Sequence, residues 1–184
     1  LKPRHHVYYY LTLLEGLGFN PGPPRLSMNI PRNELARMEA RLLALGWDRG
    51  KPLITINPGA QYGPAKRWPA ESFRTVARML GEHQPSYFVI VGSDSEISLA
   101  EELAAGMEPP PAFLAGKTTL SELAAVIGLS QLFITNDTGP MHIANALGIP
   151  LVAVFGPTDH RITGPFQEPS VFIRNEAPCW PCLY

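Results

Sequence analysis

Two segments of this sequence carry residues whose types and spacing favour binding of a phosphorylated ligand. The first, Asp137-Thr-Gly-Pro-Met-His142, has a helix-capping residue at Asp137 or Thr138 and a glycine at 139 that lets a ligand approach the backbone. The N–H groups of a first helical turn and the helix dipole bind anions. Thr138 and His142 lie four residues apart and share a helix face. A capped helix with a structural histidine is the alternative interpretation.

Lys66 is a candidate for a phosphate contact in the second segment. It lies between Gly63-Pro64 and Trp68-Pro69, so a turn and a helix start hold it in place. A lysine ammonium is a point charge suited to phosphate, and a solvated surface cation is the alternative. The segment is not a P-loop, because no Ser or Thr follows the lysine, and the sequence has no G-x-G-x-x-G motif. We interpret Trp68 as a packing residue.

Two carboxylates, Asp94 and Glu96, follow a predicted strand and a glycine. A carboxylate at such a place can accept hydrogen bonds from ribose hydroxyls. In the simpler interpretation the two acids begin the next helix and stabilise its dipole. One Asp-x-Glu pair supplies too few oxygen ligands for a metal site, so we expect neither a metal nor a cofactor.

A Cys-x-x-Cys pair, Cys179 and Cys182, lies at the end of the sequence. Its spacing is typical of a redox motif or of half a zinc site. Zinc needs two further ligands, and a redox motif is expected at a helix start early in a fold. We interpret the pair as part of an interrupted segment whose partners, if any, lie outside this sequence.

The elements that position these residues follow from the apolar pattern. Continuous apolar runs are typical of strands buried on both faces of a sheet. In this sequence such runs occupy residues 53–56, 87–91, 132–135 and 151–155, and shorter runs occupy 112–114 and 171–173. Segments with helical spacing lie between them, at 73–80, 99–103 and 120–127. Thr119-Leu-Ser-Glu122 is a capping box. This alternation predicts an α/β fold, a Rossmann-like parallel sheet with helices on both faces.

The same pattern predicts where a ligand binds. Ligands of open parallel sheets bind outside the carboxyl ends of the strands. Polar, glycine-containing segments follow four of the predicted strands, at 57–69, 92–96, 136–142 and 156–159. Because these segments open on one edge, the functional interpretation of the segment from Asp137 to His142 is favoured over the structural one.

The composition and the N-terminal residues limit the possible domain organisation of this chain. With 184 residues and 45% hydrophobic residues, a sizeable core is available and disorder is excluded. The net charge of −1 provides no basic field for nucleic acid, and no apolar run is long enough to span a membrane. A predicted helix at 5–17 precedes a linker with four prolines between 19 and 33. The first residues do not form a signal peptide, because no apolar region precedes a cleavage site. Because the sequence also lacks an initiator Met, we expect it to begin partway through a longer chain.

Two long motifs carry a family resemblance. Asn57-Pro-Gly-Ala-Gln-Tyr-Gly-Pro-Ala-Lys-Arg-Trp-Pro69 resembles a signature of glycosyltransferase family 9, the ADP-heptose:lipopolysaccharide heptosyltransferases, and is most similar to the heptosyltransferase II branch. The segment from Thr135 to Pro150, followed by Phe155-Gly-Pro-Thr158, resembles the second signature of that family. The resemblance spans most of residues 50–160.

The resemblance implies a GT-B architecture of two Rossmann-like domains, with the donor bound mainly by the second. Residues 1–30 would then end the N-terminal, acceptor-binding domain and form the linker. Residues 31–184 would form the nucleotide-sugar-binding domain, truncated at its C-terminal end. The resemblance further implies that the diphosphate contacts Lys66, the ribose contacts Glu96, and the phosphates and sugar contact Asp137, Thr138, Gly139 and His142. Asp94 competes with Glu96 for the ribose.

The implied reaction is an inverting, metal-independent transfer of heptose from ADP-heptose to the inner core of lipopolysaccharide. Lys66 would stabilise the leaving diphosphate. The family's general base belongs to the first domain and has no counterpart here, so this chain alone is expected to bind donor without turnover. We expect a cytoplasmic protein, peripheral at the inner membrane. The alternatives are a sugar-nucleotide epimerase of similar architecture, a non-catalytic nucleotide-binding module, and a family relative that transfers a different sugar.

Overall fold

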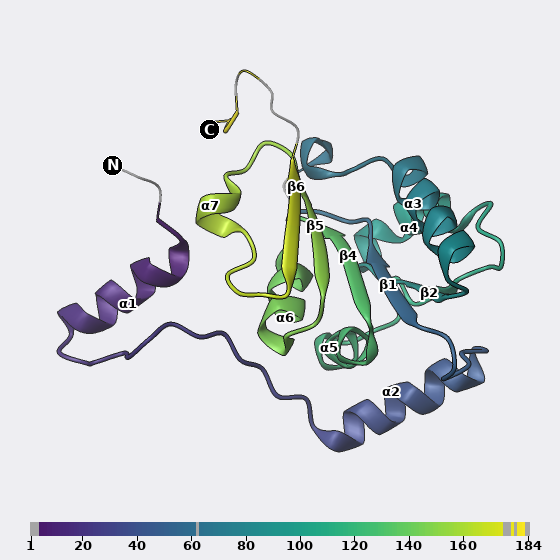
Figure 1. Ribbon diagram of the computed structural model, residues 1–184, viewed down its shortest axis with the longest axis horizontal. Coiled ribbons are helices and arrows are strands. Elements are labelled where there is room, and N and C mark those ends of the chain that lie inside the picture. Colours follow the sequence, from purple (N-terminus) through teal and green to yellow (C-terminus); the bar gives the residue numbers. More distant parts are fainter. Residues whose placement is uncertain (1–3, 62, 175–177, 179, 183–184) are drawn as a thin grey trace.

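The centre of the fold is a parallel sheet of six strands (Figure 1). The computed structural model describes residues 4–61, 63–174, 178 and 180–182. The strand order is β3-β2-β1-β4-β5-β6. The strands are β1 (Leu53–Asn57), β2 (Tyr87–Ile90), β3 (Ala112–Phe113), β4 (Leu132–Asn136), β5 (Leu151–Phe155) and β6 (Ser170–Arg174). The predicted α/β class is confirmed, and every apolar run interpreted as a strand forms one.

Helices cover both faces of the sheet. One face packs against α2 (Arg32–Ala44), α5 (Leu120–Leu129) and α6 (Gly139–Leu147), and the other against α3 (Ala70–His83) and α4 (Ile97–Ala104). Successive strand residues point to opposite faces, so Leu53 joins the first cluster of buried side chains, whereas Ile54 and Ile56 join the second. This two-sided burial explains why the strands are continuously apolar.

The carboxyl ends of the strands share one edge because the whole sheet is parallel. β1 pairs with β2 and with β4, and β4 pairs with β5, all in parallel register. Short helices follow the strands at this edge: η1 (Pro64–Lys66) after β1, η2 (Asp94–Glu96) after β2 and α7 (His160–Thr163) after β5. The prediction that four polar loops open on one edge is therefore confirmed.

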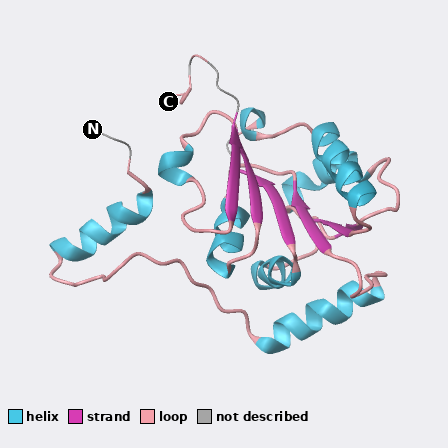
Figure 2. Cartoon of the chain, viewed as in Figure 1, coloured by secondary structure: helices cyan, strands magenta, loops and turns pink. Residues whose placement is uncertain are grey.

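The N-terminal helix α1 (His6–Gly16) lies apart from the sheet, and the predicted linker is a long loop between α1 and α2 (Figures 1 and 2). Apolar side chains of α1 face solvent, with Tyr9 69% and Leu13 58% exposed. The linker is held where the amide of Gln167 bonds both the N–H and the carbonyl of Leu26, at 3.2 and 3.0 Å. The domain boundary near residue 30 stays a prediction. None of the described helices is long and apolar enough to cross a bilayer.

Candidate functional site

A cavity of about 410 Å³ opens at the carboxyl edge of the sheet. It lies between the loops that follow β1, β2 and β4 and the start of α5. Three of the predicted site residues, Glu96, Thr138 and Gly139, line it. The other polar residues of its wall are Asn57, Gln61, Ser93, Thr118 and Thr119. Three of the four predicted loop segments therefore meet here, together with the start of α5, which was not predicted, whereas the segment 156–159 does not line the cavity.

Glu96 presents its carboxylate to this cavity. The oxygen Oε2 accepts hydrogen bonds from the backbone N–H and the hydroxyl of Ser93, both at 2.8 Å. The carboxylate also lies against Gly59, where a Cβ would come within 2.0 Å of Oε1. Asp94 is exposed and does not line the cavity, because its carboxylate lies beside Gly116. Of the two candidate acids, the structure places Glu96 at the site.

The start of α6 differs from the sequence prediction in one respect. Thr138 is the N-cap residue, but its side chain makes no capping hydrogen bond. The carboxylate of Asp137 does not cap the helix either, because Lys66 and Thr158 both bond to it. The predicted side-chain cap by Asp137 or Thr138 is therefore wrong, since stronger partners from distant loops hold Asp137. Without a side-chain cap, the positive end of the α6 dipole is left for a ligand.

Backbone geometry at this helix start favours close approach of a ligand. Pro140 supplies no N–H, and the N–H of Met141 donates to the carbonyl of Thr138 at 3.0 Å. The N–H of Gly139 is thus the first-turn donor nearest the cavity. A Cβ at position 139 would meet nothing within 4 Å, so open space lies directly above this backbone.

Lys66 lies beside the start of α6 and is not a solvated surface cation. Its Nζ donates to Oδ2 of Asp137 at 2.7 Å, with 11% of the lysine side chain and 6% of the aspartate side chain exposed. η1 carries Lys66 and β4 delivers Asp137, so the fold joins two residues that the sequence identified separately. A cation and an uncapped helix start now lie together, an arrangement that can stabilise a diphosphate.

His142 remains outside this group. It lies on the first turn of α6 but does not line the cavity, and its side chain is exposed. Partial loss of hydration nonetheless lowers the pKa of the His142 ring, with a contribution from His5 and His6, whereas the charge of Asp137 opposes the shift. The neutral form of the ring is therefore more favoured than in a fully solvent-exposed histidine. Its contact with phosphate or sugar stays a prediction.

Asn136 holds the loop that carries Lys66, a structural role that the sequence interpretation missed. It is fully buried at the end of β4. Its Nδ2 donates to the carbonyl of Pro58 at 2.7 Å, and its Oδ1 accepts from the N–H of Trp68 at 3.0 Å. The residue thus fixes both ends of the loop that carries Lys66. A polar residue that ends an apolar strand, directly before Asp137, was the available signal. Trp68 packs edge-on against Phe73, as predicted.

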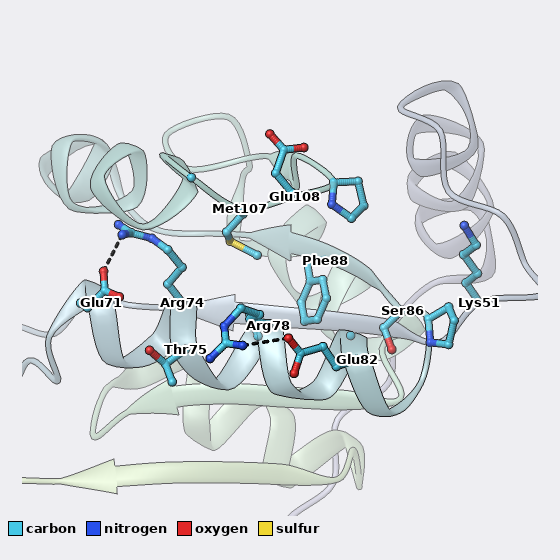
Figure 3. Close-up of a pocket in the computed structure, with 15 residues that line it drawn as sticks. Lys51, Glu71, Arg74, Thr75, Arg78, Glu82, Ser86, Phe88, Met107 and Glu108 are labelled. Atoms are coloured by element: carbon cyan, nitrogen blue, oxygen red, sulfur yellow. Dashed lines mark hydrogen bonds and ion pairs between the residues drawn. The ribbon is translucent and has the colours of Figure 1, made fainter.

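A larger cavity, of about 520 Å³, lies between α3 and the loop before β3 (Figure 3). Phe88 and Met107 contribute apolar surface to it. Four of its charged side chains form two ion pairs, Arg74 with Glu71 and Arg78 with Glu82, and Lys51 and Glu108 also line it (Figure 3). The cavity lies along α3 rather than at the carboxyl edge, where ligands of open parallel sheets bind. The edge cavity is therefore the candidate site.

The cysteine pair cannot be compared with its prediction, because Cys179 lies outside the described residues. Cys182 is an exposed free thiol whose N–H donates to the carbonyl of Pro157 at 3.0 Å. Within the described ranges, His, Cys, Asp and Glu side chains form no group of three that could hold a metal ion.

Comparison with known proteins agrees with the geometry of the site. The sequence model of glycosyltransferase family 9 (heptosyltransferase) matches residues 2–184. Lipooligosaccharide heptosyltransferase 2 of Campylobacter jejuni is 37% identical over 139 residues, which cover 73% of this chain and 43% of the relative. The enzyme of the same name from Haemophilus influenzae is 37% identical over 144 residues, which cover 76% of this chain and 40% of that relative.

Solved structures show the same fold. A glycosyl transferase of family 9 from Veillonella parvula superposes with a TM-score of 0.87 at 31% identity, covering 96% of this chain and 51% of that one. The E. coli ADP-heptose lipopolysaccharide heptosyltransferase II superposes with a TM-score of 0.73 at 29% identity, covering 84% of this chain and 47% of that one. This chain therefore spans about half the length of these proteins. The sheet, its carboxyl-edge site and these matches together place the chain in glycosyltransferase family 9, with the Rossmann-like fold of one half of a GT-B enzyme.

Proposed function

We propose that this chain is the donor-binding half of a heptosyltransferase that transfers heptose from ADP-heptose to the inner core of lipopolysaccharide. The observation that carries the proposal is the uncapped start of α6, whose Thr138 and Gly139 line the edge cavity together with Glu96. Lys66 does not line this cavity but is ion-paired with Asp137, directly before that helix start. The relatives support the choice of sugar and acceptor, since their names specify heptosyltransferases of lipopolysaccharide or lipooligosaccharide. The name of the E. coli structure specifies ADP-heptose.

Each side chain has a role in the proposed donor complex. Glu96 accepts hydrogen bonds from the ribose, the N–H of Gly139 and the dipole of α6 hold the diphosphate, and Thr138 adds a hydroxyl. Lys66 neutralises the charge that develops on the leaving diphosphate. In this proposal Lys66 and the helix provide the charge stabilisation that a metal ion supplies in other transferases.

The proposed reaction inverts the anomeric carbon. An acceptor hydroxyl attacks that carbon, the bond to the phosphate oxygen breaks, and ADP leaves with the electron pair. The hydroxyl proton passes to a carboxylate base that we assign to the acceptor-binding domain of the complete transferase. This chain alone would accordingly bind donor and lack transferase activity. We place the reaction at the cytoplasmic face of the inner membrane, where a lipid-linked acceptor would hold the enzyme peripherally.

Calorimetric titration of this chain with ADP, ADP-heptose, UDP and UDP-glucose tests the proposal. Binding of the two adenine nucleotides, with UDP and UDP-glucose much weaker, is the expected result. Tight UDP binding would favour the epimerase alternative and overturn the proposed donor. If ADP binds but the complete transferase releases no ADP from ADP-heptose in the presence of acceptor, the chain is a non-catalytic nucleotide-binding module.

A further inference from the structure

Thr158, a residue without an assigned role, contacts the ion pair beside the start of α6. Its Oγ1 lies 2.5 Å from Oδ2 of Asp137, and the Nζ of Lys66 lies 2.7 Å from the same oxygen. A hydroxyl and an ammonium therefore share one carboxylate oxygen. The three residues come from the loops after β5, β4 and β1, so this contact joins three segments of the carboxyl edge.

The loop that carries Thr158 is held by a hydrogen bond and by close packing on η1. The carbonyl of Thr158 accepts a hydrogen bond from Nε1 of Trp180 at 3.1 Å. Gly156 packs so closely on η1 that a Cβ there would lie 2.7 Å from the carbonyl oxygen of Ala65. These contacts hold the backbone beside Thr158 close to the loop that carries Lys66.

Burial makes this shared oxygen energetically important. Asp137 and Lys66 are both nearly buried, and a buried ion pair is stable only where further hydrogen bonds complete its geometry. The Thr158 hydroxyl supplies such a bond and disperses part of the charge on Oδ2. Without it, that oxygen would attract Lys66 more strongly and would repel a nearby diphosphate.

We propose that Thr158 is a positioning residue that orients the Asp137 carboxylate and thereby holds the Lys66 ammonium ready for the diphosphate of the donor. This inference rests on the proposed function, because it takes a nucleoside diphosphate as the ligand. A direct bond from Thr158 to a phosphate is the competing explanation. The two explanations differ in their dependence on Lys66. A positioning role of Thr158 requires Lys66 to be present, whereas a direct bond to phosphate does not.

The test compares the affinities of this chain for ADP and for adenosine, which lacks the diphosphate. Thr158→Val should lower ADP affinity about tenfold, the typical effect of losing a hydrogen bond to a charged group, and should leave adenosine affinity unchanged. Thr158→Ser keeps the hydroxyl and should bind ADP as the wild-type chain does. In a Lys66→Met background, Thr158→Val should have no further effect. Thr12→Val, at an exposed threonine of α1, is the matched control and should change neither affinity.

Each contrary outcome is informative. An unchanged ADP affinity in Thr158→Val, or an equal loss for ADP and adenosine, would overturn the positioning role. A tenfold loss that persists in the Lys66→Met background would instead assign Thr158 to a direct phosphate contact. If Thr158→Val does not fold, as judged by circular dichroism, Thr158→Ala takes its place with the same expectations. Failure of the wild-type chain to bind ADP would overturn the proposed function itself, and this role with it.

Discussion

The helices α5 and α6 begin at the same edge of the sheet, each after a threonine, yet their first turns are chemically opposite. At α5, Thr119 and Glu122 exchange hydrogen bonds, so the helix start satisfies itself and carries a carboxylate. At α6, the side chain of Thr138 makes no cap, and Lys66 brings a cation from another loop. The comparison teaches that a helix start is suited to an anion where the local cap is missing and a distant residue supplies a positive charge.

Removing the cation from the α6 start is the largest expected change. In the complete transferase, Lys66→Met should lower turnover about 10²- to 10³-fold, because the leaving diphosphate loses its charge partner. Since the variant also leaves the Asp137 carboxylate buried without the lysine, its melting temperature should fall. The double variant Lys66→Met/Asp137→Asn should recover the melting temperature and not the turnover. An unchanged kcat/KM would remove Lys66 from the leaving-group role.

A carboxylate placed at the start of α6 would give that helix start a negative charge, like the one Glu122 provides at the start of α5. Gly139→Asp should weaken ADP binding about a hundredfold, because like charges repel at short range. The fold should tolerate the change, since open space surrounds the new Cβ and an acidic residue favours a helix start. Gly139→Ala is the control for size alone. Equal ADP affinity in Gly139→Asp and Gly139→Ala, measured by calorimetry, would show that no anion binds at this turn.

Breaking the cap of α5 should affect stability and leave binding intact. Glu122→Ala removes the carboxylate that bonds the N–H and hydroxyl of Thr119. The melting temperature should fall by about 2–4 °C, the usual effect of losing a helix cap in a domain of this size. Calorimetry should give the wild-type ADP affinity. Thr119 lines the edge cavity, so a large loss of ADP affinity would mean that the cap of α5 also positions the ligand and that the contrast between the two helices is overstated.

The two helix starts should also differ in their response to pH, which is the smallest expected effect. His142 on α6 has a lowered pKa, so below about pH 6.5 the unfolded chain binds more protons than the folded one. Its contribution to stability is complete above that pH and is lost as the pH falls. Hydrogen bonds from Thr119 lower the pKa of Glu122, so stability at α5 is lost only as the pH falls below about 4.5.

Urea denaturation between pH 7.5 and 5.5 tests this difference. His142→Asn should reduce the dependence of the unfolding free energy on pH across that range, whereas Glu122→Ala should not. Part of the dependence should persist in His142→Asn, because burial also lowers the pKa of His160. The ring of His160 stacks on Phe172 at a centroid distance of 3.9 Å. An undiminished slope in His142→Asn would contradict the assignment.

The sheet could be predicted because its signal is local. Strands such as β1 and β4 are buried on both faces and must be continuously apolar, so a few consecutive residues suffice to identify them. The carboxyl-edge loops then follow from the parallel topology. The start of α6 could not be predicted in the same way. Asp137 is a good cap by residue type, but its partner Lys66 lies 71 residues away, and only the assembled fold decides between them.

The choice between Asp94 and Glu96 also needed the fold. Both acids follow β2 within a few residues, and their types are equivalent. Their side chains diverge because η2 turns Asp94 toward Gly116 and Glu96 toward Gly59. Asn136 was missed for a similar reason, since its two partners lie on a loop that is distant in sequence.

The contact between Gly59 and Glu96 has a consequence for protein engineering. Any side chain at position 59 would occupy the space of the Glu96 carboxylate, so the residues at these two positions depend on each other. A library that randomises the loop after β1 to change donor preference should therefore keep glycine at 59 or vary both positions together. In unrelated sequences with this loop, the residue at the position of Gly59 shows whether an acid in the next loop has room to enter the cavity.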